Sequence, residues 1–222
     1  DALVVATPEW VRESLIVEGV RAGKHLLYEK PMATSFKEAK RIYELLSVYK
    51  PITMACHSLR FTPHFSQAVE AVHHGAVWEI RHFATRRNGN RQIAERVIEK
   101  IHPCYWLSPH DIDMMHWMNK SKVKWVQAWQ RDTKDPLDDY LMVQIRFENG
   151  VDAQHMVSWC SPPVAGTATQ ALFEVFGTEG ILTINDNGTQ SILFEAGNGV
   201  KAQDTHYAPQ VQGIVVGGFR NM

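Results

Sequence analysis

Apolar runs alternate with amphipathic stretches up to residue 57. The runs ALVV (residues 2–5), HLLY (25–28) and PITMACH (51–57) are almost continuously apolar, which is typical of strands buried on both faces of a sheet. The stretches EWVRESLIVEGVRAG (9–23) and TSFKEAKRIYELLSVYK (34–50) repeat their apolar positions at helical spacing. The order strand–helix–strand–helix–strand predicts βαβ units around a parallel sheet.

The ends of the two predicted helices carry signals of their own. Gly23 stands where a C-terminal cap is expected after the first helix. Thr34 or Ser35 can cap the second helix, and Glu38 follows Ser35 at the spacing of a capping box.

Two turns follow successive strands of the predicted parallel sheet. Thr7-Pro8 closes the first strand and Glu29-Lys30-Pro31 closes the second. The carboxyl ends of parallel strands lie at one edge, where ligands bind in sheets of this kind. We therefore expect these two turns to lie side by side at a binding edge.

The pattern changes after residue 57. HFSQAVEAVHHGAV (64–77) predicts a helix that ends near Gly75, and EIRHFATRR (79–87) predicts a strand. Residues 88–108 have no regular pattern, and PHDIDMMHWMN (109–119) is again helical. In that last helix we expect Ile112, Met115 and Met118 to face inward.

Strand-like segments without intervening helices fill most of the remaining chain. Asn149-Gly150 is a strong hairpin signal between two of them. Such spacing predicts a mainly antiparallel open sheet, and hence an α+β part after the α/β part, with the join near residues 57–65. The segments are VKWVQAWQRD (123–132), YLMVQIRFE (140–148), VDAQHMVSWC (151–160), QALFEVFGT (170–178), GILTIND (180–186) and SILFEAG (191–197).

Charge and cysteine content narrow the classes of function. Among 222 residues, 23 basic and 24 acidic side chains leave a net charge of -1, so no field of one sign attracts nucleic acid or a membrane surface. No apolar run approaches the roughly 18 residues that span a bilayer. Cys56, Cys104 and Cys160 are odd in number and far apart, which indicates reduced thiols and a cytoplasmic protein.

Several motifs together resemble one enzyme family. Ala6-Thr7-Pro8, the AGKH of residues 22–25 and Glu29-Lys30-Pro31 resemble the second half of the nucleotide-binding domain of the glucose–fructose oxidoreductase / inositol dehydrogenase / MocA family. HDIDMMHWM (110–118) resembles the helix that carries the family's catalytic histidine. FEVFGTEGILTI (173–184) and GGFRNM (217–222) resemble later segments of the same family, so that the resemblance covers nearly the whole chain.

The resemblance implies a fold, a division into domains and a cofactor. Residues 1–60 would be the C-terminal part of an NAD(P)-binding Rossmann domain, and residues 61–222 an α+β domain for substrate binding and oligomerisation. Family members open with a Gly-rich turn that binds the cofactor pyrophosphate, and no G-x-G-x-x-G occurs here. We therefore expect roughly a third of a family-length chain to precede Asp1, and a short segment to follow Met222. NAD and NADP both remain open.

The family's reaction exchanges a hydride between a nicotinamide and a carbon that bears a hydroxyl, often on a sugar or cyclitol. The hydroxyl proton needs a base of near-neutral pKa, and a nearby ammonium stabilises the developing alkoxide. By resemblance, His110 is the proton acceptor and Lys30 the polarising cation. The resemblance also implies a cis Lys30–Pro31 bond. The residues implied to bind the cofactor are Ala6, Thr7, Pro8, Glu29, Lys30, Pro31 and Arg60.

The chain departs from the family pattern in one position that bears on chemistry. Many members carry an Asp four residues before the histidine, where this chain has Trp106. Tyr105 and Trp106 could form an apolar wall over a sugar ring or could be ordinary core aromatics. Arg87 could line a substrate pocket or be a solvated strand end. Together with Asp111, these residues are the candidate substrate contacts: Tyr105, Trp106, Arg87 and Asp111.

Plainer structural interpretations remain for the same residues. Glu29-Lys30 could be a surface ion pair, and His110 could belong to a helix start with Ser108 as cap and Pro109 in the first turn. His102, Cys104, His110 and His116 match no zinc spacing, so we expect no metal.

Three functions therefore compete. The first is an NAD(P)-dependent oxidoreductase that acts on a sugar, cyclitol or related polyol. The second is a catalytically silent binding or regulatory protein, which Trp106 favours. The third is a hydrolase or lyase that oxidises and re-reduces its sugar. We expect a homo-dimer or homo-tetramer formed through the antiparallel sheet.

Overall fold

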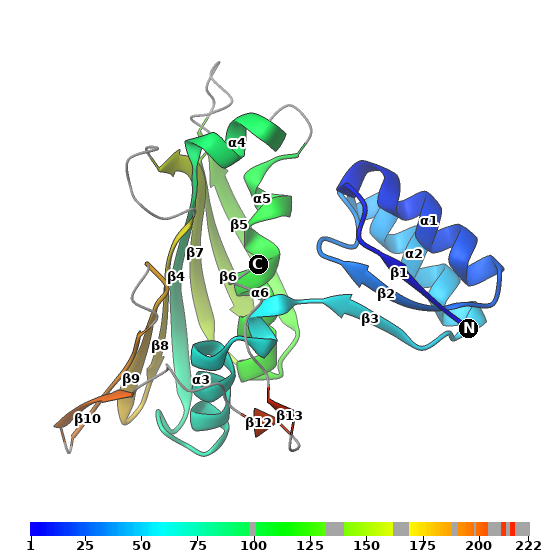
Figure 1. The fold of residues 1–222 in the computed structure, drawn as a ribbon. Coiled ribbons are helices and arrows are strands. Elements are labelled where there is room, and N and C mark those ends of the chain that lie inside the picture. Colours follow the sequence, from blue (N-terminus) through cyan, green and yellow to red (C-terminus); the bar gives the residue numbers. More distant parts are fainter. Residues whose placement is uncertain are drawn as a thin grey trace.

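The described residues form sheet A near the N-terminus, the larger sheet B after it, and a small two-stranded sheet near the C-terminal end (Figure 1). Their arrangement comes from a computed structural model. It describes residues 1–97, 101–131, 140–161, 169–187, 191–197, 199–203, 210–211 and 214–215.

Sheet A has the predicted βαβ pattern. Its strands are parallel in the order β1-β2-β3, and α1 packs against α2. Buried apolar side chains from both layers form its core, including Val5, Ile16, Leu26 and Ile42. The elements are β1 (Ala2–Val5), α1 (Glu9–Arg21), β2 (His25–Glu29), α2 (Phe36–Tyr49) and β3 (Thr53–Cys56).

The prediction that these strands are buried on both faces is wrong for the described chain. Val4, Leu27 and Met54 pair across the three strands in one row, and all three side chains are exposed. Two right-handed crossovers in the same direction place both helices on the same face of the sheet. No described segment covers the opposite face.

The predicted helix ends are confirmed. Gly23 has a φ of 69°, the left-handed conformation that glycine adopts without strain at a helix end. Ser35 is the N-cap of α2 and accepts a hydrogen bond from the Glu38 amide at 3.2 Å. The Glu38 carboxylate returns to the amide and hydroxyl of Thr34, so both candidate residues take part in the cap.

Sheet B is the predicted mainly antiparallel sheet, with strand order β11-β10-β9-β8-β4-β7-β6-β5. Among the described strand pairs of sheet B, only β4–β7 is parallel. The hairpin at Asn149-Gly150 joins β6 to β7 as predicted. The strands are β4 (Ile80–Asn90), β5 (Val123–Gln130), β6 (Tyr140–Phe147), β7 (Asp152–Ser161), β8 (Thr169–Gly177), β9 (Gly180–Asn185), β10 (Ser191–Ala196) and β11 (Gly199–Gln203); β12 (Gln210–Val211) and β13 (Ile214–Val215) pair separately.

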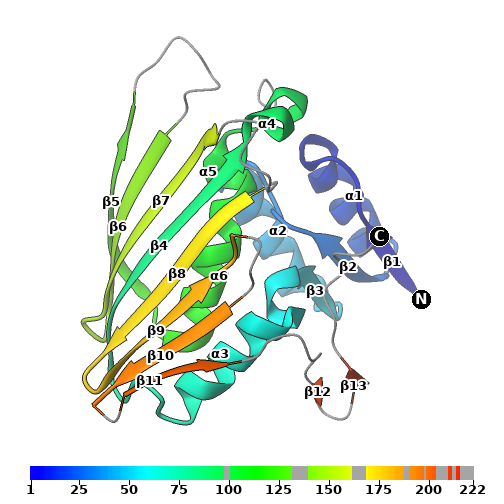
Figure 2. The ribbon, with the colours of Figure 1, turned by 60° about the vertical axis from the view of Figure 1, so that its left-hand side comes forward.

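Helices cover one face of sheet B, the face toward sheet A (Figure 2). Their apolar side chains join those of the strands in one core, with Phe65, Met114, Met115 and Phe173 fully buried. The inward orientation of Met115 and Met118 is confirmed, whereas Ile112 is only half-buried. The helical segments are η1 (Ser58–Phe61), α3 (Pro63–His73), α4 (Arg91–Val97), α5 (Pro103–Trp106) and α6 (Ser108–Asn119).

Residues 88–108 are more regular than the sequence indicated. The strand β4 extends to Asn90, and α4 and α5 follow it. Both helices are short, with 7 and 4 residues, so they contain too few turns to show an apolar period. The helix α5 brings Tyr105 and Trp106 to the start of α6.

Candidate active site

The carboxyl ends of β1, β2 and β3 meet at one edge of sheet A, which we call the rim. Val5 pairs with Tyr28 and Glu29 with Cys56, so the residues that follow each strand are neighbours. The rim therefore carries Ala6-Thr7-Pro8, Glu29-Lys30-Pro31 and His57. The Lys30–Pro31 peptide bond is cis, as the resemblance implied.

Arg12 joins the first two turns of the rim from beneath. It is 2% exposed, and its guanidinium donates hydrogen bonds to the carbonyl oxygens of Thr7 and Pro31. Glu9 lies 3.7 Å away as its ionic partner. The sequence analysis missed Arg12, although its spacing of four residues from Ile16 and eight from Val20 places it on the buried stripe of α1.

We expect Arg12→Leu to destabilise the fold by about 2–3 kcal/mol, because two buried carbonyl groups lose a charged donor. Urea unfolding measures this loss. Arg41→Leu is the control, since Arg41 is an exposed arginine in α2 that pairs with Glu13 at 3.1 Å. An exposed pair of this kind contributes about 0–1 kcal/mol. Equal losses in the two variants would contradict a structural role for Arg12.

Lys30 reaches from the rim to the helices of sheet B. Its Nζ donates a hydrogen bond of 2.8 Å to the backbone carbonyl of Trp106 and lies 4.5 Å from the centroid of the Trp106 ring. Burial lowers the pKa of Lys30 to about 8, and the carboxylates of Glu9 and Glu29 offset only part of that effect.

His110 lies in the first turn of α6, four residues after Trp106, and is half-buried. The predicted cap at Ser108 is wrong, because α6 begins at Ser108 and Leu107 is its N-cap residue. The Ser108 hydroxyl instead forms a hydrogen bond of 2.9 Å with Nε2 of buried His155. Burial lowers the pKa of His155, which is therefore held neutral beneath α6.

Arg60 provides a second link between the rim and α6. Its guanidinium donates two hydrogen bonds to the Asp113 carboxylate, at 2.8 and 2.7 Å, and lies over the Trp117 ring. His57 Nδ1 is 3.7 Å from the same carboxylate. Burial lowers the pKa of His57 although Asp113 acts in the opposite direction. Arg60 therefore lies beside the rim but is engaged by α6, and His57 is a rim residue that the sequence analysis missed.

Arg87 and Asp111 bind each other. Two hydrogen bonds of 2.7 and 2.9 Å join them, and they are 3% and 0% exposed. The pair fastens α6 to β4, so it gives no support to the predicted substrate contacts through these side chains, and Arg87 is not a solvated strand end. Tyr105 is exposed and Trp106 half-buried beside Lys30, so these two remain candidates for a substrate wall.

The rim has donors and acceptors that suit a nicotinamide nucleotide. The Thr7 hydroxyl oxygen is buried and has no hydrogen-bond partner among the described residues. The Glu29 carboxylate and the Lys30 ammonium lie in the next turn. A hydroxyl, a carboxylate and a cation can pair with ribose hydroxyls and a carboxamide, so these residues fit that cofactor.

Of the residues considered as zinc ligands, His102 and Cys104 have a structural role. His102 Nδ1 accepts a hydrogen bond of 3.1 Å from the Cys104 amide and so caps α5. Within the described ranges, no three His, Cys, Asp or Glu side chains are grouped closely enough to hold a metal ion.

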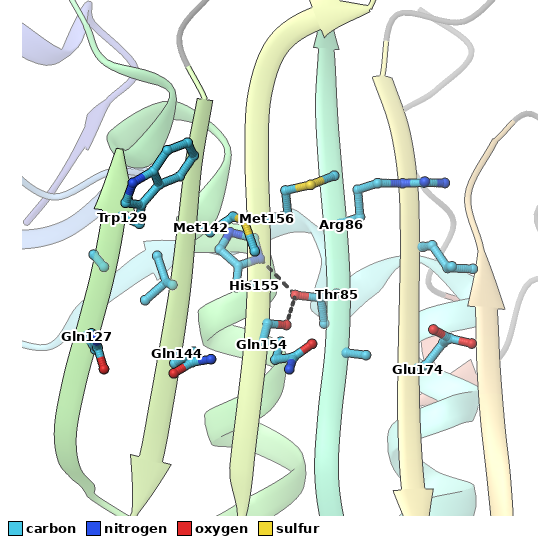
Figure 3. A pocket seen from close by; sticks show the side chains of 14 residues that line it. Thr85, Arg86, Gln127, Trp129, Met142, Gln144, Gln154, His155, Met156 and Glu174 are labelled. Atoms are coloured by element: carbon cyan, nitrogen blue, oxygen red, sulfur yellow. Dashed lines mark hydrogen bonds between the residues drawn. The ribbon is translucent and has the colours of Figure 1, made fainter. Parts of the chain in front are cut away.

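A hollow lies elsewhere, on the face of sheet B that is turned away from α6. It has a volume of about 470 Å³, and Trp129, Met142 and Met156 line it together with a row of three glutamines (Figure 3). The glutamines Gln127, Gln144 and Gln154 pair across β5, β6 and β7. This open face shares no lining residue with the rim.

No helix in the described part of the chain is both long and apolar enough to cross a lipid bilayer.

Two family profiles match the chain. Residues 1–57 match one described as oxidoreductase family, NAD-binding Rossmann fold, and residues 65–183 match one described as GFO/IDH/MocA C-terminal domain. Levoglucosan dehydrogenase of Pseudarthrobacter phenanthrenivorans is 24% identical over 82% of the chain and 54% of its own length. The 2,7-anhydro-N-acetylneuraminate hydratase of Escherichia coli is 27% identical over 44% of the chain and 26% of its own length.

Solved structures share the fold. An inositol dehydrogenase homologue from Azotobacter vinelandii, complexed with NADH and myo-inositol, has a TM-score of 0.79 at 16% identity, over 99% of this chain and 61% of its own. Levoglucosan dehydrogenase in complex with NADH and levoglucosan has a TM-score of 0.79 at 22% identity, over 92% of this chain and 60% of its own. The chain thus spans little more than half the length of the relatives it matches.

Proposed function

The chain belongs to the GFO/IDH/MocA oxidoreductase family, and from that premise we propose that it carries active-site residues of an NAD(P)-dependent oxidoreductase. Its substrate would be a secondary alcohol or ketone of a sugar, cyclitol or related polyol. One observation supports this most: the Lys30 side chain extends from the rim to the α5–α6 segment that carries His110.

The chain's own residues would do three things in this reaction. The turn Ala6-Thr7-Pro8 and the turn Glu29-Lys30-Pro31 hold the nicotinamide end of the cofactor, and Arg12 fixes the two turns relative to each other. The bound nicotinamide supplies the hydride exchange. The Lys30 ammonium polarises the substrate oxygen, and His110 is positioned in the first turn of α6 as the predicted proton acceptor.

Titration of the complete protein with NADH and NADPH, followed by nicotinamide fluorescence, tests the proposal. We expect saturable binding of at least one nucleotide and reduction of NAD or NADP with a member of a panel of sugars and cyclitols. Binding of neither nucleotide would contradict the proposal. Nucleotide binding without turnover on any panel member would favour the catalytically silent alternative.

The second candidate is a hydratase or lyase that uses its nicotinamide transiently. The similarity to the 2,7-anhydro-N-acetylneuraminate hydratase of Escherichia coli motivates it. The two candidates differ in the fate of the cofactor. A dehydrogenase converts one equivalent of NAD or NADP for each substrate molecule, whereas the alternative forms product with no net change in absorbance at 340 nm.

We also propose that the open face of sheet B is where copies of the protein associate. The open face presents exposed Trp129 and Met142 beside Arg86 and Glu174, an apolar and charge-balanced surface that supports a homo-dimer or homo-tetramer. Sedimentation of the complete protein as a monomer would contradict this.

Free thiols at Cys56 and Cys104 support a cytoplasmic protein, which alkylation of both in unreduced lysate would test. Limited proteolysis tests the division into residues 1–60 and 61–222.

A further inference from the structure

The Lys30 ammonium is held by neutral groups. Its Nζ has one carbonyl oxygen, that of Trp106, at 2.8 Å, and the ring of the same residue at 4.5 Å. Trp106 is the last residue of α5, so its carbonyl has no donor within that helix and is available to Lys30. No carboxylate of the described chain forms an ion pair with Nζ.

Charged groups surround Lys30 at longer range. The carboxylates of Glu9 and Glu29 favour its charged form, whereas the guanidinium groups of Arg12 and Arg87 disfavour it. His57, after β3, is coupled to the same charge. Since two cations oppose two anions, their effects on the pKa of Lys30 largely cancel, and burial is the main cause that lowers this pKa. The charged or titratable groups that act on Lys30 are thus Glu9 and Arg12 of α1, Glu29 of β2, Arg87 of β4, and His57 after β3.

We propose that Trp106 is a positioning residue that holds Lys30 through uncharged groups, and that Lys30 exchanges a proton with the substrate oxygen. This inference rests on the proposed function and moves to Lys30 the proton transfer that the family resemblance gives to His110. During alcohol oxidation the substrate O–H bond breaks, its electron pair stays on oxygen, and the Lys30 amine forms a new N–H bond. The carbon–hydrogen pair leaves as the hydride of the proposed reaction, so one ketone and one ammonium result.

A carboxylate in contact with Lys30 would stabilise its ammonium form and keep it protonated. The observed partners of Lys30 do not have this effect, because they carry no charge. A carbonyl and a ring face attract an ammonium but carry no charge, so their attraction does not offset the free-energy cost of burying the ammonium. The lowered pKa of Lys30, about 8, agrees with this geometry. Below that pH the group is mostly ammonium, and above it mostly amine. The group can therefore both donate and accept a proton near neutral pH.

The test is a direct titration of Lys30 in the complete protein, independent of activity. Acetylation by acetic anhydride is followed at several pH values by mass spectrometry of the peptide that contains Lys30, and the midpoint of the rate gives its pKa. Three variants are compared with the wild type. Trp106→Phe keeps a carbonyl and a ring, Trp106→Asp adds a carboxylate, and Tyr105→Asp adds the same charge at the exposed neighbouring position.

We expect a wild-type midpoint near 8 and an unchanged midpoint in Trp106→Phe. Trp106→Asp should raise the midpoint by about one to three pH units, and Tyr105→Asp by much less. The pH profile of kcat/KM should move with the midpoint. A wild-type midpoint above 10 would overturn the inference even if Trp106→Asp failed to fold. If Lys30 titrates near 8 but the pH profile of kcat/KM does not follow this titration, the proposed proton transfer is overturned. Failure to bind nucleotide would instead overturn the proposed function.

Discussion

Asp111→Ala should destabilise the protein by about 3–5 kcal/mol, because it leaves the Arg87 guanidinium buried without its partner. Arg87 is 3% exposed and donates two of its hydrogen bonds to Asp111, which is fully buried. Urea unfolding followed by circular dichroism measures the loss. The double variant Arg87→Met/Asp111→Leu should recover much of it, since a buried ion pair replaced by apolar side chains costs little.

The chain contains a matched control for this prediction. Arg146 and Asp152 form the same two-bond pair, at 2.6 and 2.7 Å, but their side chains are 45% and 47% exposed. Asp152→Ala should therefore cost no more than about 1 kcal/mol. Similar losses in Asp111→Ala and Asp152→Ala would show that burial does not set the value of the Arg87–Asp111 pair.

The arrangement of sheet A and the rim could be predicted because local patterns specify them. Continuous apolar runs identify the strands, Gly23 and Ser35 mark helix ends, and the parallel order then requires the turns after β1 and β2 to be neighbours. The same reasoning could have added His57, since it follows the third strand just as Thr7 and Lys30 follow the first two. It was missed because the third run was taken only as a strand.

The partners of the charged side chains could not be predicted. Arg87 is 24 residues from Asp111, Arg60 is 53 from Asp113 and Lys30 is 76 from Trp106. Sequence spacing constrains contacts only within one helix or one strand pair, whereas these pairs depend on how α5 and α6 lie over sheet B and beside the rim. For this reason the sequence offered Arg87 and Asp111 as separate candidate substrate contacts and gave no sign of the ion pair between them.

The departure from the family pattern at Trp106 also has a meaning that only the structure supplies. From the sequence, Trp106 was a missing carboxylate and thus an argument for lost activity. In the structure the carbonyl and the ring of Trp106 contact Lys30, so this residue takes part in the site through groups that carry no charge.

Lys30→Ala should lower kcat/KM by about a thousand-fold or more, the loss expected when a group that transfers the proton and stabilises charge on oxygen is removed. NADH or NADPH affinity should change only a few-fold, because Arg12 and the backbone of the rim remain. Lys30→Arg should not restore turnover, since a guanidinium stays protonated at any working pH and cannot release its proton. A small primary amine such as methylamine should rescue Lys30→Ala in proportion to its unprotonated fraction. Steady-state kinetics of the complete protein on its best panel substrate, with nucleotide binding measured by fluorescence, gives both quantities; retention of turnover within ten-fold in Lys30→Ala would remove Lys30 from the chemistry.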